Sequence, residues 1–183
     1  MKRFLSIAAC AAAIGVSSSA QAQYTEGGDV FDATPWGFAF RIGYAFPLDD
    51  NLREVSDSFF SFGIDYYLSR PFFRTGETYF SLDWYGKTIS GQKGNFFPLM
   101  VNHKWYTERA PLTAPEGHRS YFFAGLGAVF MDTANSDVVI GARGGVGVEL
   151  GPYFFAEGAL TISERASGRV HANTIGAYLG YRF

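Results

Sequence analysis

Apolar positions alternate with small or polar positions along most of this chain. Between Trp36 and Phe46, every even-numbered residue is aromatic or aliphatic, and the odd-numbered residues are glycine, alanine or Arg41. Successive side chains of a β-strand point to opposite faces of a sheet. The segment therefore predicts a strand with one wholly apolar face.

The same period of two recurs in seven further segments. The eight predicted strands are 36–46, 58–69, 78–88, 95–106, 121–130, 138–150, 154–163 and 174–183. Each is long enough for a tilted membrane-spanning strand of about 9–11 residues. The fourth is the weakest, because Pro98 lacks a backbone donor and His103 falls on the apolar face. We expect that strand to begin after Pro98 or to carry a bulge there.

The two faces of the predicted sheet differ in a way that decides which one points outward. The apolar face is rich in Phe, Trp and Tyr, whereas glycines and ionisable residues share the other. The charged positions on that second face are Arg41, Asp65, Asp83, Lys87, Lys104, Arg143, Glu149, Glu157 and Arg182. A soluble barrel would turn its apolar face inward. Five bases and four acids separated by glycines instead suit a narrow lumen, where opposite charges pair.

These patterns together predict an all-β fold, an eight-stranded antiparallel up-and-down transmembrane β-barrel. Closure leaves no unpaired strand edge in lipid. No later segment has 18 consecutive apolar residues, which excludes a helical membrane protein. A soluble barrel with exchanged faces is the alternative.

The lumen of an eight-stranded barrel is just wide enough to be filled by its own side chains. Large aromatic residues share the charged face: Tyr67, Tyr79, Tyr85, Tyr106, Phe123 and Tyr178. We therefore expect a plugged lumen in which Arg41, Arg143 and Arg182 pair with the acids as a structural network. A narrow pore through that network is the alternative.

The N-terminal residues resemble a secretory signal. Lys2 and Arg3 precede an alanine-rich apolar stretch, and Ala20-Gln21-Ala22 has small residues where a signal peptidase cleaves. The predicted organisation is a signal peptide at 1–22, an N-terminal extension at 23–35 and the barrel at 36–183. A retained N-terminal anchor is the alternative. Because Cys10 leaves with the signal, a thiol nucleophile, a disulfide and a cysteine-ligated metal are excluded.

Composition narrows the remaining classes. The formal net charge is −2 and becomes more acidic when the two signal bases are removed, so nothing favours nucleic acid as a partner. Aromatic residues make up 18% of the chain and 22 residues are glycine, which suits a membrane barrel. His103 and His118 share no ligand spacing with acids, so we expect neither a metal nor a cofactor.

The C-terminal strand resembles the signal that the barrel-assembly machinery reads on bacterial outer-membrane barrels. It ends in Phe183 and has apolar residues at alternate positions before it, including Ile175, Leu179 and Tyr181. The whole mature chain resembles small eight-stranded barrels of the outer membrane protein A and X type. That resemblance implies an outer-membrane location, contact with outer-membrane lipid, assembly through the C-terminal strand and a monomeric state.

The resemblance also implies periplasmic termini. The outward connections would then be 47–57, 86–94, 132–137 and 164–169. One departure is the long connection 107–119 on the periplasmic side. Either that turn is unusual, or the fourth and fifth strands are misplaced.

Catalysis is the main functional alternative. Lipid A 3-O-deacylases are barrels of this kind with a His-x-Ser-Asn-type motif near the penultimate strand, and the motif histidine is absent from segment 160–165 here. His171 with Ser163 or Ser167 and Glu164 could still meet near the outer rim. We expect these to be polar loop residues, and a non-enzymatic barrel with an envelope-structural or surface-binding role. The alternatives are a lipid-modifying enzyme of the deacylase type and a narrow pore.

Overall fold

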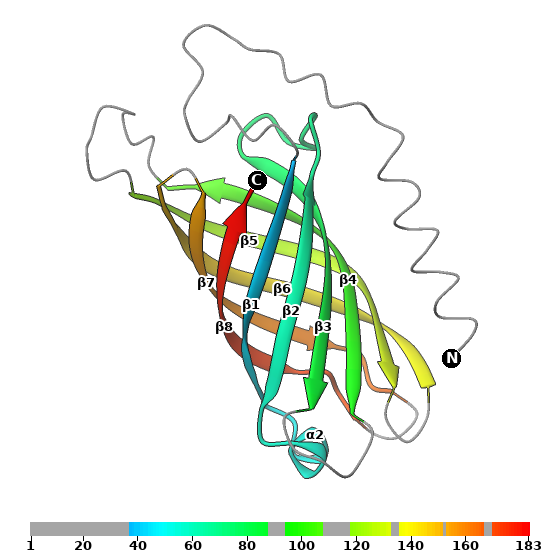
Figure 1. The fold of residues 1–183 in the computed structure, drawn as a ribbon. Helices are drawn as coiled ribbons and strands as arrows, with labels where there is room; N and C mark the ends of the chain where they lie inside the picture. Colours follow the sequence, from blue (N-terminus) through cyan, green and yellow to red (C-terminus); the bar gives the residue numbers. More distant parts are fainter. Residues whose placement is uncertain (1–36, 88–93, 108–117, 133–135, 152, 167–169) are drawn as a thin grey trace, which may run out of the picture.

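The computed structural model describes residues 37–87, 94–107, 118–132, 136–151, 153–166 and 170–183. Eight strands close into one antiparallel barrel in chain order, and β8 pairs with β1 (Figure 1). The elements are β1 (Phe38–Pro47), α2 (Asp50–Val55), β2 (Phe59–Tyr67), β3 (Glu77–Lys87), β4 (Asn95–Tyr106), β5 (His118–Asp132), β6 (Ser136–Leu150), β7 (Phe154–Ser163) and β8 (Thr174–Arg182). The predicted fold class is confirmed. The predicted signal peptide and N-terminal extension lie outside the described residues.

The strand pairings resolve the question of the long connection between the fourth and fifth strands. Tyr106 lies opposite Tyr121, and the β4–β5 ladder runs without a break to Asn95 and Asp132. The two strands are therefore correctly placed, and the alternative that they were misplaced is wrong. β4 ends and β5 begins at the end of the barrel that carries the C-terminus, and residues 108–117 between them lie outside the described part of the chain (Figure 1).

Pro98 neither delays the start of β4 nor introduces a bulge, so both expectations for this position are wrong. The strand begins at Asn95, and Pro98 lies opposite Val129 of β5. On the β3 side, pairing is interrupted between Leu82–Leu99 and Tyr85–Phe96 and resumes in the same register. A proline removes a ladder donor. Here the loss falls on one side of the strand only, and the register survives.

The apolar face points outward. Ile42 is 51% exposed, Leu126 67% and Leu179 63%, whereas Arg41 and Lys104 on the alternate positions are buried. An apolar exterior around a charged interior is the arrangement of a membrane barrel, so the soluble alternative with exchanged faces is wrong. Within the described residues, no helix has the length and apolar composition needed to cross a membrane.

One element was not predicted. Helix α2 lies in the β1–β2 connection, at the end of the barrel opposite the C-terminus (Figure 1). Asp49 caps it by accepting a hydrogen bond from the Leu52 backbone amide at 3.1 Å. Leu52 is fully buried among lumen side chains, and this burial holds the short helix in place.

Candidate functional site

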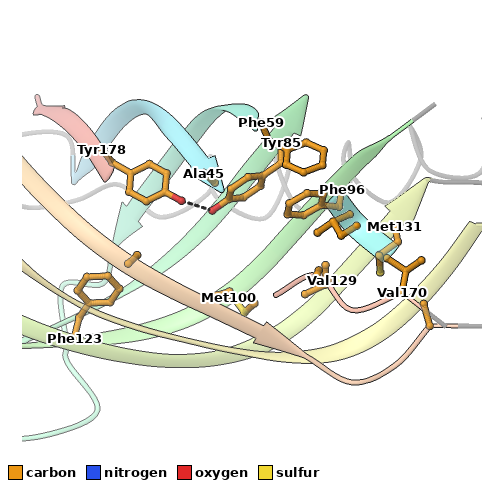
Figure 2. Close-up of a cluster of buried hydrophobic side chains, with 14 of the residues drawn as sticks. Ala45, Phe59, Tyr85, Phe96, Met100, Phe123, Val129, Met131, Val170 and Tyr178 are labelled. Carbon is orange, nitrogen blue, oxygen red and sulfur yellow. Dashed lines mark hydrogen bonds between the residues drawn. The ribbon is translucent and has the colours of Figure 1, made fainter. Parts of the chain in front are cut away.

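The lumen is the candidate site, and its end nearest α2 is filled by apolar side chains. We call this group the apolar plug: Leu52, Phe59, Phe96, Val129, Met131, Ala166, Val170 and Ala172. Figure 2 shows several of them converging from different strands near the hydrogen-bonded hydroxyls of Tyr85 and Tyr178, which lie 2.9 Å apart. Phe96 stacks on Tyr85 with ring centroids 4.4 Å apart. Packed hydrocarbon therefore occupies this end of the lumen.

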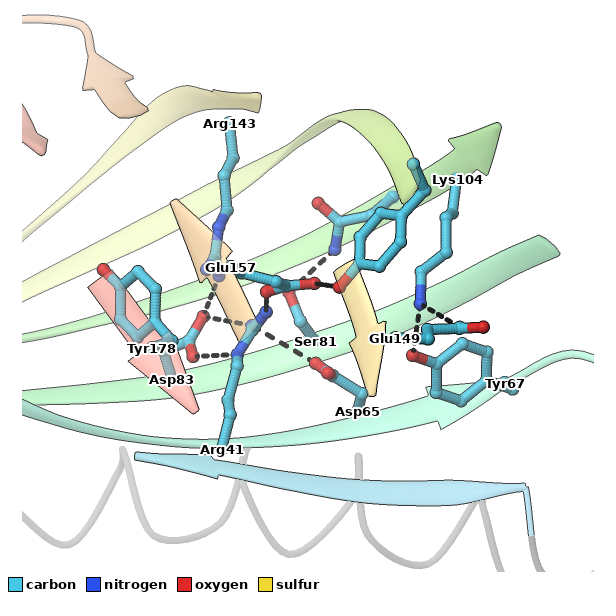
Figure 3. Close-up of polar contacts among 12 residues, drawn as sticks. Arg41, Asp65, Tyr67, Ser81, Asp83, Lys104, Arg143, Glu149, Glu157 and Tyr178 are labelled. Atoms are coloured by element: carbon cyan, nitrogen blue, oxygen red, sulfur yellow. Dashed lines mark hydrogen bonds and ion pairs between the residues drawn. The ribbon is translucent and has the colours of Figure 1, made fainter. Parts of the chain in front are cut away.

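Five charged residues occupy the middle of the lumen, and we call them the central cluster: Arg41, Asp65, Asp83, Arg143 and Glu157. The Arg41 guanidinium donates to both carboxylate oxygens of Asp83, at 3.1 and 2.9 Å, and to Glu157 at 3.1 Å (Figure 3). Arg143 donates to Asp83 at 2.7 Å. All of these side chains are buried, so their charges are shielded from water and depend on one another.

Asp65 is the least supported member of the central cluster. Its Oδ1 lies 3.2 Å from Arg41 Nη2, an ion pair between two fully buried groups. Neither carboxylate oxygen accepts a hydrogen bond from the residues that the structure describes. Asp83, in contrast, accepts from two arginines.

A second group lies nearer the end that carries the C-terminus, and we call it the terminal cluster: Glu77, Lys104, Arg119, Glu149 and Arg182. Arg119 donates to Glu149 at 2.8 Å, and Arg182 pairs with Glu77. Lys104 Nζ lies 3.5 Å from Glu149 Oε1. Polar pairs occupy this end of the lumen, whereas hydrocarbon side chains occupy the other end.

Tyrosines join the two clusters. The Tyr121 hydroxyl donates to Glu157 of the central cluster at 2.9 Å, and the Lys104 ammonium lies 4.2 Å from the centroid of the Tyr121 ring. Lys104 also donates to the Tyr67 hydroxyl at 3.2 Å, and the Arg119 guanidinium lies 3.5 Å from the Tyr106 ring centroid. Cation–π contacts are strongest when both groups are desolvated, as they are here. The network is therefore continuous from Arg41 to Arg182.

The structure describes the side chains of all but one of the predicted lumen residues. The structure brings together all of the predicted positions whose side chains it describes: Arg41, Asp65, Asp83, Lys104, Arg143, Glu149, Glu157 and Arg182. The Lys87 side chain lies outside the described part of the chain. Glu77 and Arg119 were missed because each lies just beyond a predicted strand end. Both share the inward parity of their strands, which is the signal that could have found them.

The grouping of Ser163, Glu164 and His171 has a different geometry from a catalytic set. The Ser163 hydroxyl donates to the Glu164 carbonyl at 2.9 Å and accepts from the Ala172 amide at 2.7 Å. The hydrogen bond between His171 and Ser163 joins His171 Nδ1 to the backbone oxygen of Ser163, at 3.1 Å, and does not involve the Ser163 hydroxyl. A nucleophile and its base need a direct hydrogen bond between the hydroxyl and the imidazole. Among the described residues, these side chains instead fix the β7–β8 connection; Ser167 lies outside them.

His103 lies on the outward face, as predicted, but it is buried. Its Nε2 lies 2.8 Å from the Thr75 carbonyl and its Nδ1 lies 2.8 Å from the Thr78 hydroxyl. A carbonyl only accepts, so Nε2 carries a hydrogen, and in the neutral ring Nδ1 then accepts from Thr78. The Thr78 hydroxyl in turn accepts from the Phe72 amide at 2.9 Å. The β2–β3 connection therefore covers a polar side chain that would otherwise face lipid.

No protein-family model matches the chain, and no curated protein matches its sequence. Solved structures do match. Neisserial surface protein A is 12% identical with a TM-score of 0.52, and the match covers 80% of this chain and 97% of that one. The outer membrane enzyme PagL is 11% identical with a TM-score of 0.48, covering 80% and 97% of the two chains. The outer membrane protein Ail of Yersinia pestis is 17% identical with a TM-score of 0.48, covering 80% and 98%. The chain has the fold of the small eight-stranded outer-membrane barrels.

Proposed function

We propose that this chain is a non-enzymatic outer-membrane barrel with a closed lumen, and that its role is to support the envelope or to bind partners at its outer rim. The observation that carries the proposal is the filling of the lumen. The apolar plug occupies one end, and the paired charges of the central and terminal clusters occupy the rest. Side chains that satisfy one another in this way leave the rims and the outer wall as the surfaces that can meet other molecules.

The outer wall supports insertion in a membrane. Exposed aliphatic and aromatic side chains surround the barrel, among them Phe62, Leu126, Val146 and Leu160. Burial of such side chains in hydrocarbon is favourable by about 25 cal/mol per Å². The closed hydrogen-bonded ring leaves no strand edge for lipid to solvate. We assign the outer membrane because the fold is that of outer-membrane barrels.

The C-terminal strand supports assembly by the barrel-assembly machinery. Ile175, Leu179 and Phe183 are exposed on the outward face of β8 and its end, and Tyr181 lies on the same face. Before closure, β8 would present this apolar row to the machinery. Because β8 then pairs with β1, no edge remains for a second copy, and the proposed state is a monomer.

Conductance across a planar lipid bilayer tests the closed lumen. We expect the wild-type barrel to give no conductance steps, and Asp83→Asn to give none either, because the apolar plug lies outside the central cluster. Steps in the wild type whose size or ion selectivity changes in Asp83→Asn would establish a pore and overturn the proposal. Heat-dependent mobility on gels should accompany each sample, so that only folded barrels are compared.

Analysis of the host's outer-membrane lipids tests the absence of catalysis. Cells that express the chain should yield lipid A of unchanged acylation by mass spectrometry. Loss of an acyl chain in wild-type cells, abolished by Ser163→Ala or His171→Ala, would show a deacylase and contradict the proposal.

A further inference from the structure

The β2–β3 connection, residues 68–76, carries a feature that a closed lumen does not explain. It lies at the end of the barrel that carries the C-terminus (Figure 1). Its sequence, Leu-Ser-Arg-Pro-Phe-Phe-Arg-Thr-Gly, holds two adjacent phenylalanines between two arginines and no acid. Phe72 is 65% exposed and Phe73 56%, and Arg70 and Arg74 are exposed as well. We call these residues the basic aromatic loop.

The loop is fixed against the outside of the barrel wall. Thr78 and His103, which hold it, are an outward-facing pair on β3 and β4. The Leu68 amide donates to the Thr78 carbonyl at 2.8 Å, and the His103 ring holds the Thr75 carbonyl. These bonds draw the loop over the outer wall and away from the mouth of the lumen.

Gly76 permits this close approach. Its φ is +95°, and a Cβ at this position would lie 2.0 Å from the Lys104 carbonyl oxygen and 2.9 Å from His103 Nε2. Positive φ is readily adopted by glycine and strained for other residues. The chain can therefore turn directly against β4 and return into β3.

The aromatic part of the loop continues a band on the barrel wall. The Phe73 ring lies 4.8 Å from the His103 ring and 6.1 Å from the Trp105 ring, and Trp105 stacks on Phe122 at 5.2 Å. Aromatic rings of this kind gather at the level of the lipid headgroups. Arginines beside them are placed where lipid phosphates lie. Neither Arg70 nor Arg74 forms an ion pair with a residue in the part of the chain that the structure describes.

We propose that the basic aromatic loop binds anionic phospholipid of the membrane leaflet on the C-terminal side of the barrel. Phe72 and Phe73 enter the boundary between headgroups and acyl chains, and Arg70 and Arg74 pair with the lipid phosphates. The charge of the loop is complementary to such a surface, and each arginine near it strengthens binding about five-fold. The inference rests on the proposed insertion of the barrel in a membrane, and names a lipid class that this loop selects.

Native mass spectrometry of barrels released from nanodiscs tests the selection. The nanodiscs contain equal amounts of phosphatidylglycerol and phosphatidylcholine. The wild type should retain phosphatidylglycerol preferentially, and Arg70→Gln with Arg74→Gln should lower the ratio of the two retained lipids by about five-fold for each arginine. Arg165→Gln is the matched control for Arg70→Gln alone, because Arg165 is exposed near the opposite rim and each of these substitutions removes one positive charge. An unchanged ratio in the double variant, or an equal fall in the control, would overturn the proposal.

A second measurement tests the depth of the phenylalanines. Phe72→Trp should add a fluorescence component that lipids brominated near the headgroup end of the acyl chain quench. Fluorescence unaffected by these lipids would place the loop in water and refute the aromatic part of the proposal. If the protein shows no heat-dependent mobility shift on gels, the proposal that it is a membrane barrel is wrong. If it shows the shift but retains both lipids equally, only the inference about the loop is wrong.

Discussion

Arg41 on β1 forms a two-pronged ion pair with Asp83 on β3 by reaching across β2, the strand that separates them. The position between the two residues is Gly63, which lies opposite Arg41 on one side and opposite Asp83 on the other. A Cβ at Gly63 would lie 2.2 Å from Asp83 Oδ1 and 2.8 Å from Arg41 Nε. The missing side chain is therefore what allows the central cluster to form.

Gly63→Ala should destabilise the barrel because its methyl group displaces the buried pair. Overpacking of this kind costs about 1–3 kcal/mol. Gly158→Ala is the matched control, since a Cβ there meets nothing within 4 Å. Urea unfolding of both variants in lipid, followed by tryptophan fluorescence, gives the two free energies. Equal losses at the two positions would contradict the role assigned to Gly63.

The two aspartates of the central cluster should respond differently to the same substitution. Asp83→Asn leaves Arg41 and Arg143 buried without their shared partner, and breaking a buried pair costs about 3–5 kcal/mol. Asp65→Asn leaves two cations facing two carboxylates, so the free energy of unfolding should change by no more than about 1 kcal/mol. The measurement is urea unfolding of both variants beside the wild type. A larger loss for Asp65→Asn than for Asp83→Asn would reverse the assignment.

Leu52→Ala should loosen the apolar plug. Removing a fully buried leucine side chain costs about 2–5 kcal/mol, and here the loss falls on the short helix α2. We expect protease cleavage within 48–58 to accelerate while the strands stay protected. The exposed Glu54 on the same helix supplies the control, as Glu54→Ala should leave the cleavage rate unchanged. A cleavage rate in Leu52→Ala equal to that of the wild type would mean that the leucine does not hold the helix.

His103→Phe should release the basic aromatic loop without opening the barrel. The substitution removes the donor to the Thr75 carbonyl and the acceptor for the Thr78 hydroxyl. Two lost hydrogen bonds are worth about 2 kcal/mol, so amide exchange at Phe72 should accelerate roughly 30-fold. His171→Phe, near the opposite rim, serves as the comparison and should leave Phe72 unaffected. Unchanged exchange at Phe72 in His103→Phe would show that the loop is held by other contacts.

The barrel could be predicted from the sequence because its defining signal is local. In a strand, parity alone decides whether a residue such as Arg41 or Ile42 faces the lumen or the lipid. Glu77 and Arg119 were missed because strand ends are set by pairing with a neighbour, and such pairings are not local. The same reason hides α2, a helix too short to persist without the burial of Leu52.

His103 shows most plainly which contacts could not be predicted from the sequence. Its position on the apolar face was correctly predicted, but nothing in the sequence near it indicates that residues 72–75 return to cover it. The partners of Lys104 are equally hidden from the sequence. Alternation places this residue in the lumen, but the aromatic rings around its ammonium group and its carboxylate partner come from five other strands. Contacts between residues far apart in the chain require the closed barrel to be known.

The long-range pairs of the lumen constrain the order in which the barrel can be made. Arg41 contacts Glu157 at a separation of 116 residues, and Arg182 contacts Glu77 at a separation of 105. Before the first and last strands meet, these two pairs cannot form, and an open sheet would expose any charged group left unpaired to hydrocarbon at a cost of several kcal/mol. Closure must therefore accompany entry into the bilayer. Membrane insertion and β1–β8 pairing should therefore occur in a single kinetic step. No intermediate should accumulate in which the strands are inserted but the barrel is still open.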